Sequence, residues 1–143
     1  MIIDTTYLLP LARIRVRRDL LRAIADGNLK VDIDFRDLKV SLISIFELQA
    51  KAFKLEIPPN YVYEAVDTIF KSFYVVPFYK RDVIFKAYEL RGMVDDYIDS
   101  VILATAIVLG EDLVTEDKLI HKVKSEVEKR YNLRVYCFDD LAG

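Results

Sequence analysis

The chain has 143 residues, of which 53% are hydrophobic and 31% charged, a balance typical of a folded globular protein and not of a disordered one. Its formal net charge of −2 excludes a polycation, so any nucleic acid must be bound through a local basic patch or through metal ions. The single cysteine, Cys137, excludes an internal disulfide and a zinc site made of several thiolates.

The sequence predicts one domain over residues 1–143, because this length suits a single domain and four Gly and four Pro leave little room for linkers. The N-terminal stretch MIIDTTYLL has no cationic region before its apolar residues, unlike a secretory signal peptide. No apolar run approaches the ~20 residues that cross a membrane. We therefore expect a cytoplasmic protein without membrane contact.

Short apolar segments alternate with amphipathic ones along the chain. In chain order the pattern predicts a strand at 1–4, a helix at 5–26, a strand at 39–43, helices at 44–55 and 60–73, a strand at 74–78, helices at 80–92 and 94–109, a strand at 111–115, a helix at 116–131 and a strand at 133–138. This alternation predicts a parallel α/β sheet covered by helices on both faces. Ligands bind such sheets beyond the carboxyl ends of the strands.

Four acidic residues lie where these strands and helices meet. Asp4 ends the first strand, and Asp117 follows the fourth strand in the segment VTED. Glu47 lies on the first turn of the helix after the second strand, and Asp99 lies near the start of the helix that leads into the fourth. If strands one, two and four are neighbours, three of these acids meet at one edge of the sheet, and Asp99 can join them.

Each acid also has a purely structural interpretation as part of a helix cap. Asp4 and Asp96 could each cap a helix, and Ser44 with Glu47 matches a capping box. Thr115 could cap the helix that follows the fourth strand. A cap contributes only ~0.5–2 kcal/mol, and Ser or Asn would serve equally well.

Taken together, the four acids predict a metal site. Converging carboxylates repel one another, so some of them must take up protons or recruit a cation. Mg²⁺ and Mn²⁺ prefer carboxylate oxygens and engage substrate phosphates, and such a site can hydrolyse a phosphodiester. Other catalytic patterns are weaker, because no Walker A or GxGxxG loop is present and the only histidine, His121, lies among lysines on a predicted solvated helix.

The sequence resembles PIN-domain proteins, and most of all the toxin ribonucleases of VapBC toxin–antitoxin modules. The resemblance spans essentially the whole chain and rests on four segments in order: MIIDTTYLL, SIFELQAKA, DSVILATAI and LVTEDKLI. It implies a three-layer α/β/α fold with a central parallel sheet of about five strands in the order 3-2-1-4-5. It also implies a metal-dependent endoribonuclease that prefers single strands.

Residue by residue, the resemblance assigns the metal site to four acids, with Mg²⁺ or Mn²⁺ as the cofactor: Asp4, Glu47, Asp99 and Asp117. Thr5 and Thr115 match small polar residues that the family places near the first and last acid, and they could orient carboxylates or waters. Many relatives have Asn where this chain has Thr6, so the resemblance gives Thr6 no role.

Three aspartates share the segment VDDYIDS. Asp99 directly precedes SVILATA, as in the family's pattern, and is therefore preferred as the metal ligand. On an ideal helix Asp95 shares a face with Asp99 at i,i+4 and Asp96 shares one at i,i+3. Either neighbour could therefore play a supporting role.

The segment RIRVRRDLLR, residues 13–22, carries five Arg and one Asp shortly after the first acid. Four of these arginines could hold RNA phosphates through bidentate contacts: Arg13, Arg15, Arg17 and Arg18. The alternative is a solvated helix face. In toxins of the resembled type a groove made by early helices binds an antitoxin segment and the toxin often dimerises, so the resemblance implies an antitoxin partner and a homodimer.

The leading hypothesis is a Mg²⁺- or Mn²⁺-dependent endoribonuclease that hydrolyses RNA and is the toxin of a toxin–antitoxin pair. Two alternatives stay open. One is a chromosomal RNA-processing PIN nuclease without an antitoxin, and the other is a non-catalytic PIN-like module that binds RNA or a protein. The intact set of four acids argues against the non-catalytic alternative.

Overall fold

A five-stranded sheet forms the centre of the protein, in a computed structural model that describes all 143 residues. The strands lie in the order β3-β2-β1-β4-β5: β1 (Ile2–Ile3), β2 (Lys39–Ser41), β3 (Tyr74–Val76), β4 (Leu113–Val114) and β5 (Val135–Tyr136). Every neighbouring pair is parallel. The α/β class, the parallel sheet and the order 3-2-1-4-5 are therefore confirmed.

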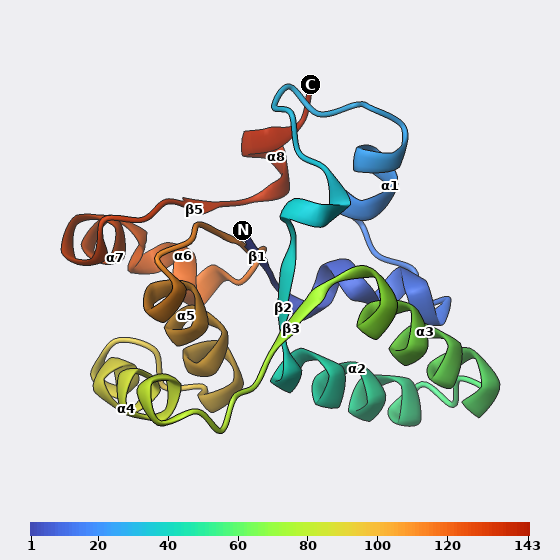
Figure 1. Cartoon of the computed structure of the whole chain (residues 1–143), viewed down its shortest axis with the longest axis horizontal. Helices are drawn as coiled ribbons and strands as arrows, with labels where there is room; N and C mark the ends of the chain where they lie inside the picture. The colour runs from blue at the N-terminus through green and yellow to red at the C-terminus, as the bar shows by residue number, and fades with distance from the viewer.

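Helices surround this sheet (Figure 1). The first half of the chain forms the 3₁₀ helices η1 (Thr5–Ala12) and η2 (Phe35–Asp37) and the α-helices α1 (Leu20–Ala25), α2 (Leu42–Lys54) and α3 (Pro59–Ser72). The second half forms α4 (Arg81–Glu89), the 3₁₀ helix η3 (Leu90–Gly92), α5 (Tyr97–Leu109), α6 (Lys118–Lys122), α7 (Lys124–Tyr131) and α8 (Phe138–Leu141). None of these helices combines the length and the apolarity that crossing a bilayer requires.

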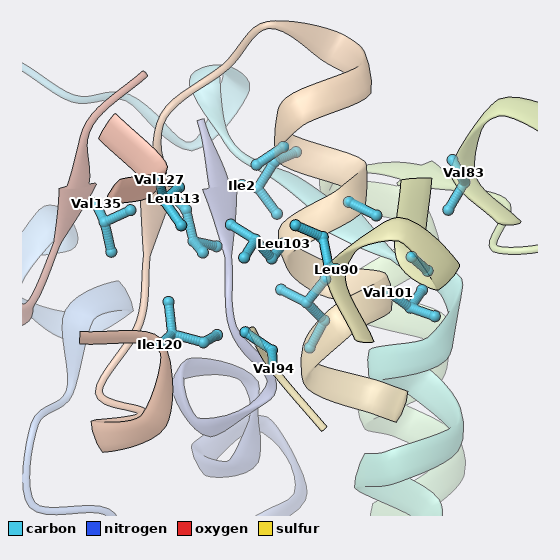
Figure 2. Packing of buried hydrophobic residues seen from close by; sticks show 14 of the residues in the cluster. Ile2, Val83, Leu90, Val94, Val101, Leu103, Leu113, Ile120, Val127 and Val135 are labelled. Atoms are coloured by element: carbon cyan, nitrogen blue, oxygen red, sulfur yellow. The ribbon is translucent and has the colours of Figure 1, made fainter. Parts of the chain in front are cut away.

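Each face of the sheet has its own hydrophobic core, because successive residues of a strand point to opposite faces. Ile2 and Leu113 belong to the core that α4, α5 and α7 cover (Figure 2). Ile3 and Val114, the next residues along the two strands, belong to the core that η1, α1 and α3 cover. The register of β1 and β4 pairs Ile2 with Leu113 and Ile3 with Val114. Paired residues of the two strands therefore belong to the same core.

The single helix predicted over residues 5–26 is wrong. η1 is a 3₁₀ helix that contains Pro10, and it ends at Arg13, whose backbone is left-handed (φ 63°). Proline has no amide hydrogen to donate and disfavours a continuous α-helix. Over residues 13–17 exposed Arg alternates with half-buried Ile and Val, which is the period of an extended chain. The α-helix begins only at Leu20.

Helix α2 begins two residues earlier than predicted. The Ser41 side chain caps it by accepting a hydrogen bond from the Ile43 amide (3.2 Å). The predicted capping box is therefore wrong, because Ser44 lies within the first turn and Glu47 within the second. Either serine suits a cap, and Ser41 takes the position because β2 ends there.

The helix predicted over residues 116–131 is divided at Val123 into α6 and α7. Asp117, and not Thr115, caps α6, and its side chain accepts a hydrogen bond from the Ile120 amide (3.0 Å). The prediction that His121 is solvated is also wrong. Its ring is half-buried, and Nε2 lies 2.7 Å from the Thr115 carbonyl oxygen, to which it can donate a hydrogen bond.

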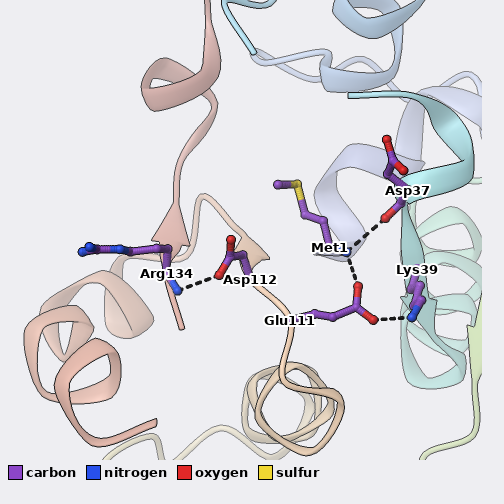
Figure 3. Close-up of polar contacts among 6 residues, drawn as sticks. All are labelled: Met1, Asp37, Lys39, Glu111, Asp112 and Arg134. Carbon is purple, nitrogen blue, oxygen red and sulfur yellow. Dashed lines mark hydrogen bonds and ion pairs between the residues drawn. The ribbon is translucent and has the colours of Figure 1, made fainter. Parts of the chain in front are cut away.

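Ion pairs connect the strands at their amino ends (Figure 3). Glu111, which lies just before β4, pairs with Lys39 of β2 and with the amino group of Met1. Nearby, the Asp112 carboxylate accepts a hydrogen bond from the Arg134 amide (2.8 Å). The four acids of interest lie toward the opposite, carboxyl ends of the strands.

Candidate active site

Asp4 directly follows β1 and is 6% exposed. One of its carboxylate oxygens accepts a hydrogen bond from the Thr5 amide (2.6 Å), and the other accepts one from the Thr115 hydroxyl. Burial raises the pKa of Asp4, and these two hydrogen bonds partly oppose it. The negative charges of Glu47 and Asp117 raise the pKa further, so both acids are close enough to act on Asp4.

Thr115 joins the carboxyl ends of β1 and β4. Its buried hydroxyl donates to Asp4 and accepts a hydrogen bond from the Asp117 amide (3.0 Å). Asp117 is fixed a second time by capping α6. The position of the Asp117 carboxylate therefore depends on the same threonine that holds Asp4.

Asp99 enters the site from the first turn of α5. The predicted cap of this helix is confirmed, because the Asp96 side chain accepts a hydrogen bond from the Asp99 amide (3.0 Å). Burial raises the pKa of Asp99 to about 8, and a hydrogen bond to the Asp117 carboxyl and the charges of nearby acids act in the same direction. The protonated form of Asp99 is therefore strongly favoured compared with that of an ordinary aspartate. Asp95 is exposed and precedes the helix, so the predicted i,i+4 relation to Asp99 does not apply.

No basic side chain pairs with the four acids, since every ion pair in the molecule involves other carboxylates. The acids do not form a closed cage either, because no group of three or more His, Cys, Asp or Glu side chains is placed to hold one ion. Their oxygens suit a hard cation such as Mg²⁺, which keeps several waters and binds through one or two carboxylates. The residues therefore fit a partly hydrated cation and not one ligated by protein alone.

The four arginines predicted to bind RNA lie beyond the far end of η1. Eight residues of 3₁₀ helix, at ~2 Å each, separate this end from Asp4 by ~16 Å. Arg13 stacks on Tyr61, with its guanidinium carbon 3.9 Å from the ring centre, and Arg18 pairs with Asp139 (3.2 Å). The other two arginines are exposed and belong to none of the ion pairs. The arginines thus lie apart from the acids and do not neutralise them.

Sequence reasoning missed a contact that holds the segment between β4 and α6. Tyr7 is fully buried, and its hydroxyl donates a hydrogen bond to the Glu116 carboxylate. The same carboxylate accepts a hydrogen bond from the Phe138 amide (2.7 Å). Asp117 is the next residue along this segment. The only local signal was a second acid beside Asp117, and no sequence pattern joins Tyr7 to a residue 109 positions away.

A sequence profile of the family described as PIN domain matches residues 1–126, a range that includes all four acids. The chain belongs to the PIN domain family. The resemblance that the sequence suggested is thereby confirmed at the level of the family. No curated protein matches the sequence.

Solved structures similar to this PIN domain include toxin–antitoxin proteins. A toxin–antitoxin complex from Klebsiella pneumoniae is 21% identical, with a TM-score of 0.58 over 83% of this chain and 88% of that one. VapBC2 from Rickettsia felis, bound to a DNA fragment from its promoter, is 19% identical, with a TM-score of 0.61 over 95% and 96%. FitAcB from Neisseria gonorrhoeae is 17% identical, with a TM-score of 0.60 over 95% and 96%. At these identities the similarity shows a shared fold.

Proposed function

We propose that this PIN domain is a metal-dependent endoribonuclease and the toxin of a toxin–antitoxin pair. The observation that carries the proposal is the group of four acids at the carboxyl edge of the sheet, none of which has a basic partner: Asp4, Glu47, Asp99 and Asp117. Such a group is electrostatically unfavourable until a cation or protons neutralise it. The family match and the toxin–antitoxin proteins among the similar structures support the assignment.

The chain's own residues have distinct parts in this proposal. When bound, Mg²⁺ or Mn²⁺ would supply an activated water and neutralise charge on the scissile phosphate. Asp4 offers a carboxylate that Thr5 and Thr115 hold in place, and Asp117 offers one that its helix cap fixes. Asp99 must release its proton before it can act as a ligand, so protons and cations compete there.

The proposed substrate is RNA, whose backbone would extend from the acids toward the arginines beyond η1. Arg15 and Arg17 are exposed on a chain that is acidic overall. Arg13 is also exposed, and its guanidinium stacks on the ring of Tyr61. Guanidinium groups bind phosphates through paired hydrogen bonds without reading sequence. Replacing Arg15 and Arg17 with Ala should weaken RNA binding and reduce its salt dependence, as filter binding at several salt concentrations would measure.

The proposed antitoxin site is an apolar groove of about 1000 Å³ between the end of α2 and the start of α3. Phe53 and Tyr63 line it, and they are 86% and 70% exposed. Large apolar side chains gathered at this exposure mark an interaction surface.

We also propose a homodimer, which the exposed side chains of Phe85 and Tyr88 on α4 support. Sedimentation of the protein with and without a co-expressed antitoxin tests both the homodimer and the antitoxin complex.

The deciding experiment is RNA cleavage with and without Mg²⁺ or Mn²⁺. Wild type should cleave single-stranded RNA only with the metal, and Asp4→Asn should abolish cleavage while still binding RNA. Asp26→Asn is the matched control, because Asp26 is an exposed aspartate at the carboxyl end of α1 and its charge is not among those that act on Asp4 or Asp99. Cleavage that withstands both chelator and Asp4→Asn would refute the proposal, and RNA binding without cleavage in any metal would favour a non-catalytic module.

A further inference from the structure

Two buried hydroxyl groups have no hydrogen-bond partner within the protein, those of Thr5 and Ser44. Thr5 is 1% exposed and Ser44 is 0% exposed. The other buried serines and threonines each make a hydrogen bond: Ser41, Ser100, Thr105 and Thr115. Buried polar groups are nearly always paired, so each exception in a native fold calls for a functional or structural reason.

Both exceptions lie beside the proposed metal ligands. Thr5 follows Asp4, and its amide already donates to the Asp4 carboxylate. Ser44 lies three residues before Glu47 on α2, so the two share one face of the helix. Side chains on an α-helix lean toward its amino end, which brings the Glu47 side chain over the turn that contains Ser44.

The position of Ser44 also explains why its hydroxyl has no partner in the backbone. A serine or threonine within a helix usually donates to the carbonyl four residues earlier, as Thr105 does to Val101 (2.7 Å). Ser44 lies in the first turn of α2, and the residue four positions before it, Val40, belongs to β2. The usual helical acceptor is therefore missing at Ser44, and its hydroxyl can serve another group.

We propose that Ser44 is a positioning residue of the acidic site, with Thr5 in the same role on the other side. The Ser44 hydroxyl donates a hydrogen bond, directly or through one water, to the Glu47 carboxylate when that carboxylate turns toward a bound cation. The inference rests on the proposed function, because it assigns these hydroxyls to the metal site. It adds Ser44, which the sequence pattern marked only as part of a capping box and to which the family resemblance gave no role.

The test compares Ser44→Ala with Thr105→Val, using calorimetric titration with Mn²⁺ and thermal unfolding without metal. Ser44→Ala should bind Mn²⁺ about tenfold or more weakly, as expected when a group that orients a ligand is lost. Its melting temperature without metal should be unchanged or higher, because the variant removes an unpaired buried hydroxyl. Thr105→Val should bind Mn²⁺ as wild type does but should melt at a lower temperature, because Thr105 donates to the Val101 carbonyl (2.7 Å) and lies six residues after Asp99 on α5.

A second pair of variants tests the hydroxyl of Thr5 without changing its volume. Thr5→Val removes the hydroxyl and should weaken Mn²⁺ binding. Thr5→Ser keeps the hydroxyl and should bind Mn²⁺ with the affinity of wild type. Wild-type Mn²⁺ affinity in Ser44→Ala, or a lower melting temperature of that variant without metal, would overturn the inference. If wild type itself binds no Mn²⁺, the proposed function fails first, and the role of Ser44 fails with it.

Discussion

At the amino edge of the sheet Glu111 has two cationic partners, Lys39 and the Met1 amino group, whereas at the carboxyl edge Asp4 and Asp99 have none. Burial raises the pKa of Glu111, but hydrogen bonds from its two partners lower it below the ordinary value. Burial also raises the pKa of Asp4 and Asp99, and no positive charge opposes it there. The two edges therefore place similar groups in opposite electrostatic environments.

The difference separates a structural use of acids from the functional one that we propose. Glu111 connects β2, β4 and the chain's first residue, and its charge contributes to folding. The acids at the carboxyl edge repel one another and lose hydration, so their charges oppose folding. A protein that keeps such a group gives up stability at a functional site. Four experiments test this division.

Asp99→Asn should have the largest effect, and its effects on activity and stability should have opposite signs. Cleavage of RNA in Mg²⁺ or Mn²⁺ should fall about 100-fold or more, because a lost metal ligand removes several kcal/mol of transition-state stabilisation. The same variant should be more stable than wild type without metal, because folding forces the wild-type Asp99 either to take up a proton or to hold an unfavourable charge, and Asn does neither. Single-turnover cleavage and urea denaturation measure the two effects. A less stable but fully active variant would show that Asp99 belongs to the structure and not to the site.

The pH dependence of stability should differ between the two edges. In the folded protein the pKa of Asp99 is about 8, against an ordinary value of 3.8, so between these values the folded state holds a proton that the unfolded state releases. Without metal the melting temperature should therefore fall as the pH rises from about 4 to about 8. The lowered pKa of Glu111 has the opposite sign, and its contribution should be lost as the pH falls below its ordinary value of 4.5.

Calorimetry between about pH 5 and pH 8 measures the part that belongs to Asp99. The slope should be smaller in Asp99→Asn, and saturating Mn²⁺ should remove or reverse it in wild type, because the cation binds the deprotonated site. A slope that both changes leave intact would assign the effect to other groups.

The sheet could be predicted because its strands are short apolar runs with acids or turns directly after them. Asp4 and Asp117 were predicted as candidate site residues in this way, since a carboxylate after a buried strand is visible in the sequence itself. The helix predicted over residues 5–26 failed because Arg and apolar residues also alternate with a period of two in RIRVR, and the extended pattern was taken for a helical one.

The contacts within the site could not be predicted in the same way. Thr115 and Asp4 are 111 positions apart, and their hydrogen bond exists only because β1 and β4 are neighbours in the sheet. The start of α2 was missed for a local reason, because Ser41 and Ser44 both suit a helix cap and only the end of β2 decides between them. Because the predicted helix began at Ser44, the sequence assigned Ser44 to the helix cap and did not indicate that its hydroxyl is buried without a partner.

Glu111→Gln should have a smaller effect, confined to stability. The variant keeps the size of the side chain but loses its charge, and we expect a loss of ~1 kcal/mol in the free energy of unfolding, or about 3 °C in melting temperature. RNA cleavage should remain at the wild-type level, because Glu111 lies at the opposite edge from the acids. Glu126→Gln is the matched control, since Glu126 is an exposed residue of α7. Raising the salt concentration should shrink the difference between wild type and Glu111→Gln.

Asp95→Asn should have the smallest effect, and it tests where the acidic site ends. Asp95 and Asp99 would share a helix face if both belonged to α5, but α5 begins at Tyr97 and Asp96 is its cap. Asp95 is therefore exposed on the segment before the helix, and its charge is not among those that raise the pKa of Asp99. We expect cleavage within about twofold of wild type and stability within ~0.5 kcal/mol, as for most surface substitutions. A tenfold loss of cleavage with unchanged stability would instead extend the site into this segment, and substrate contacts would then have to reach beyond the four acids.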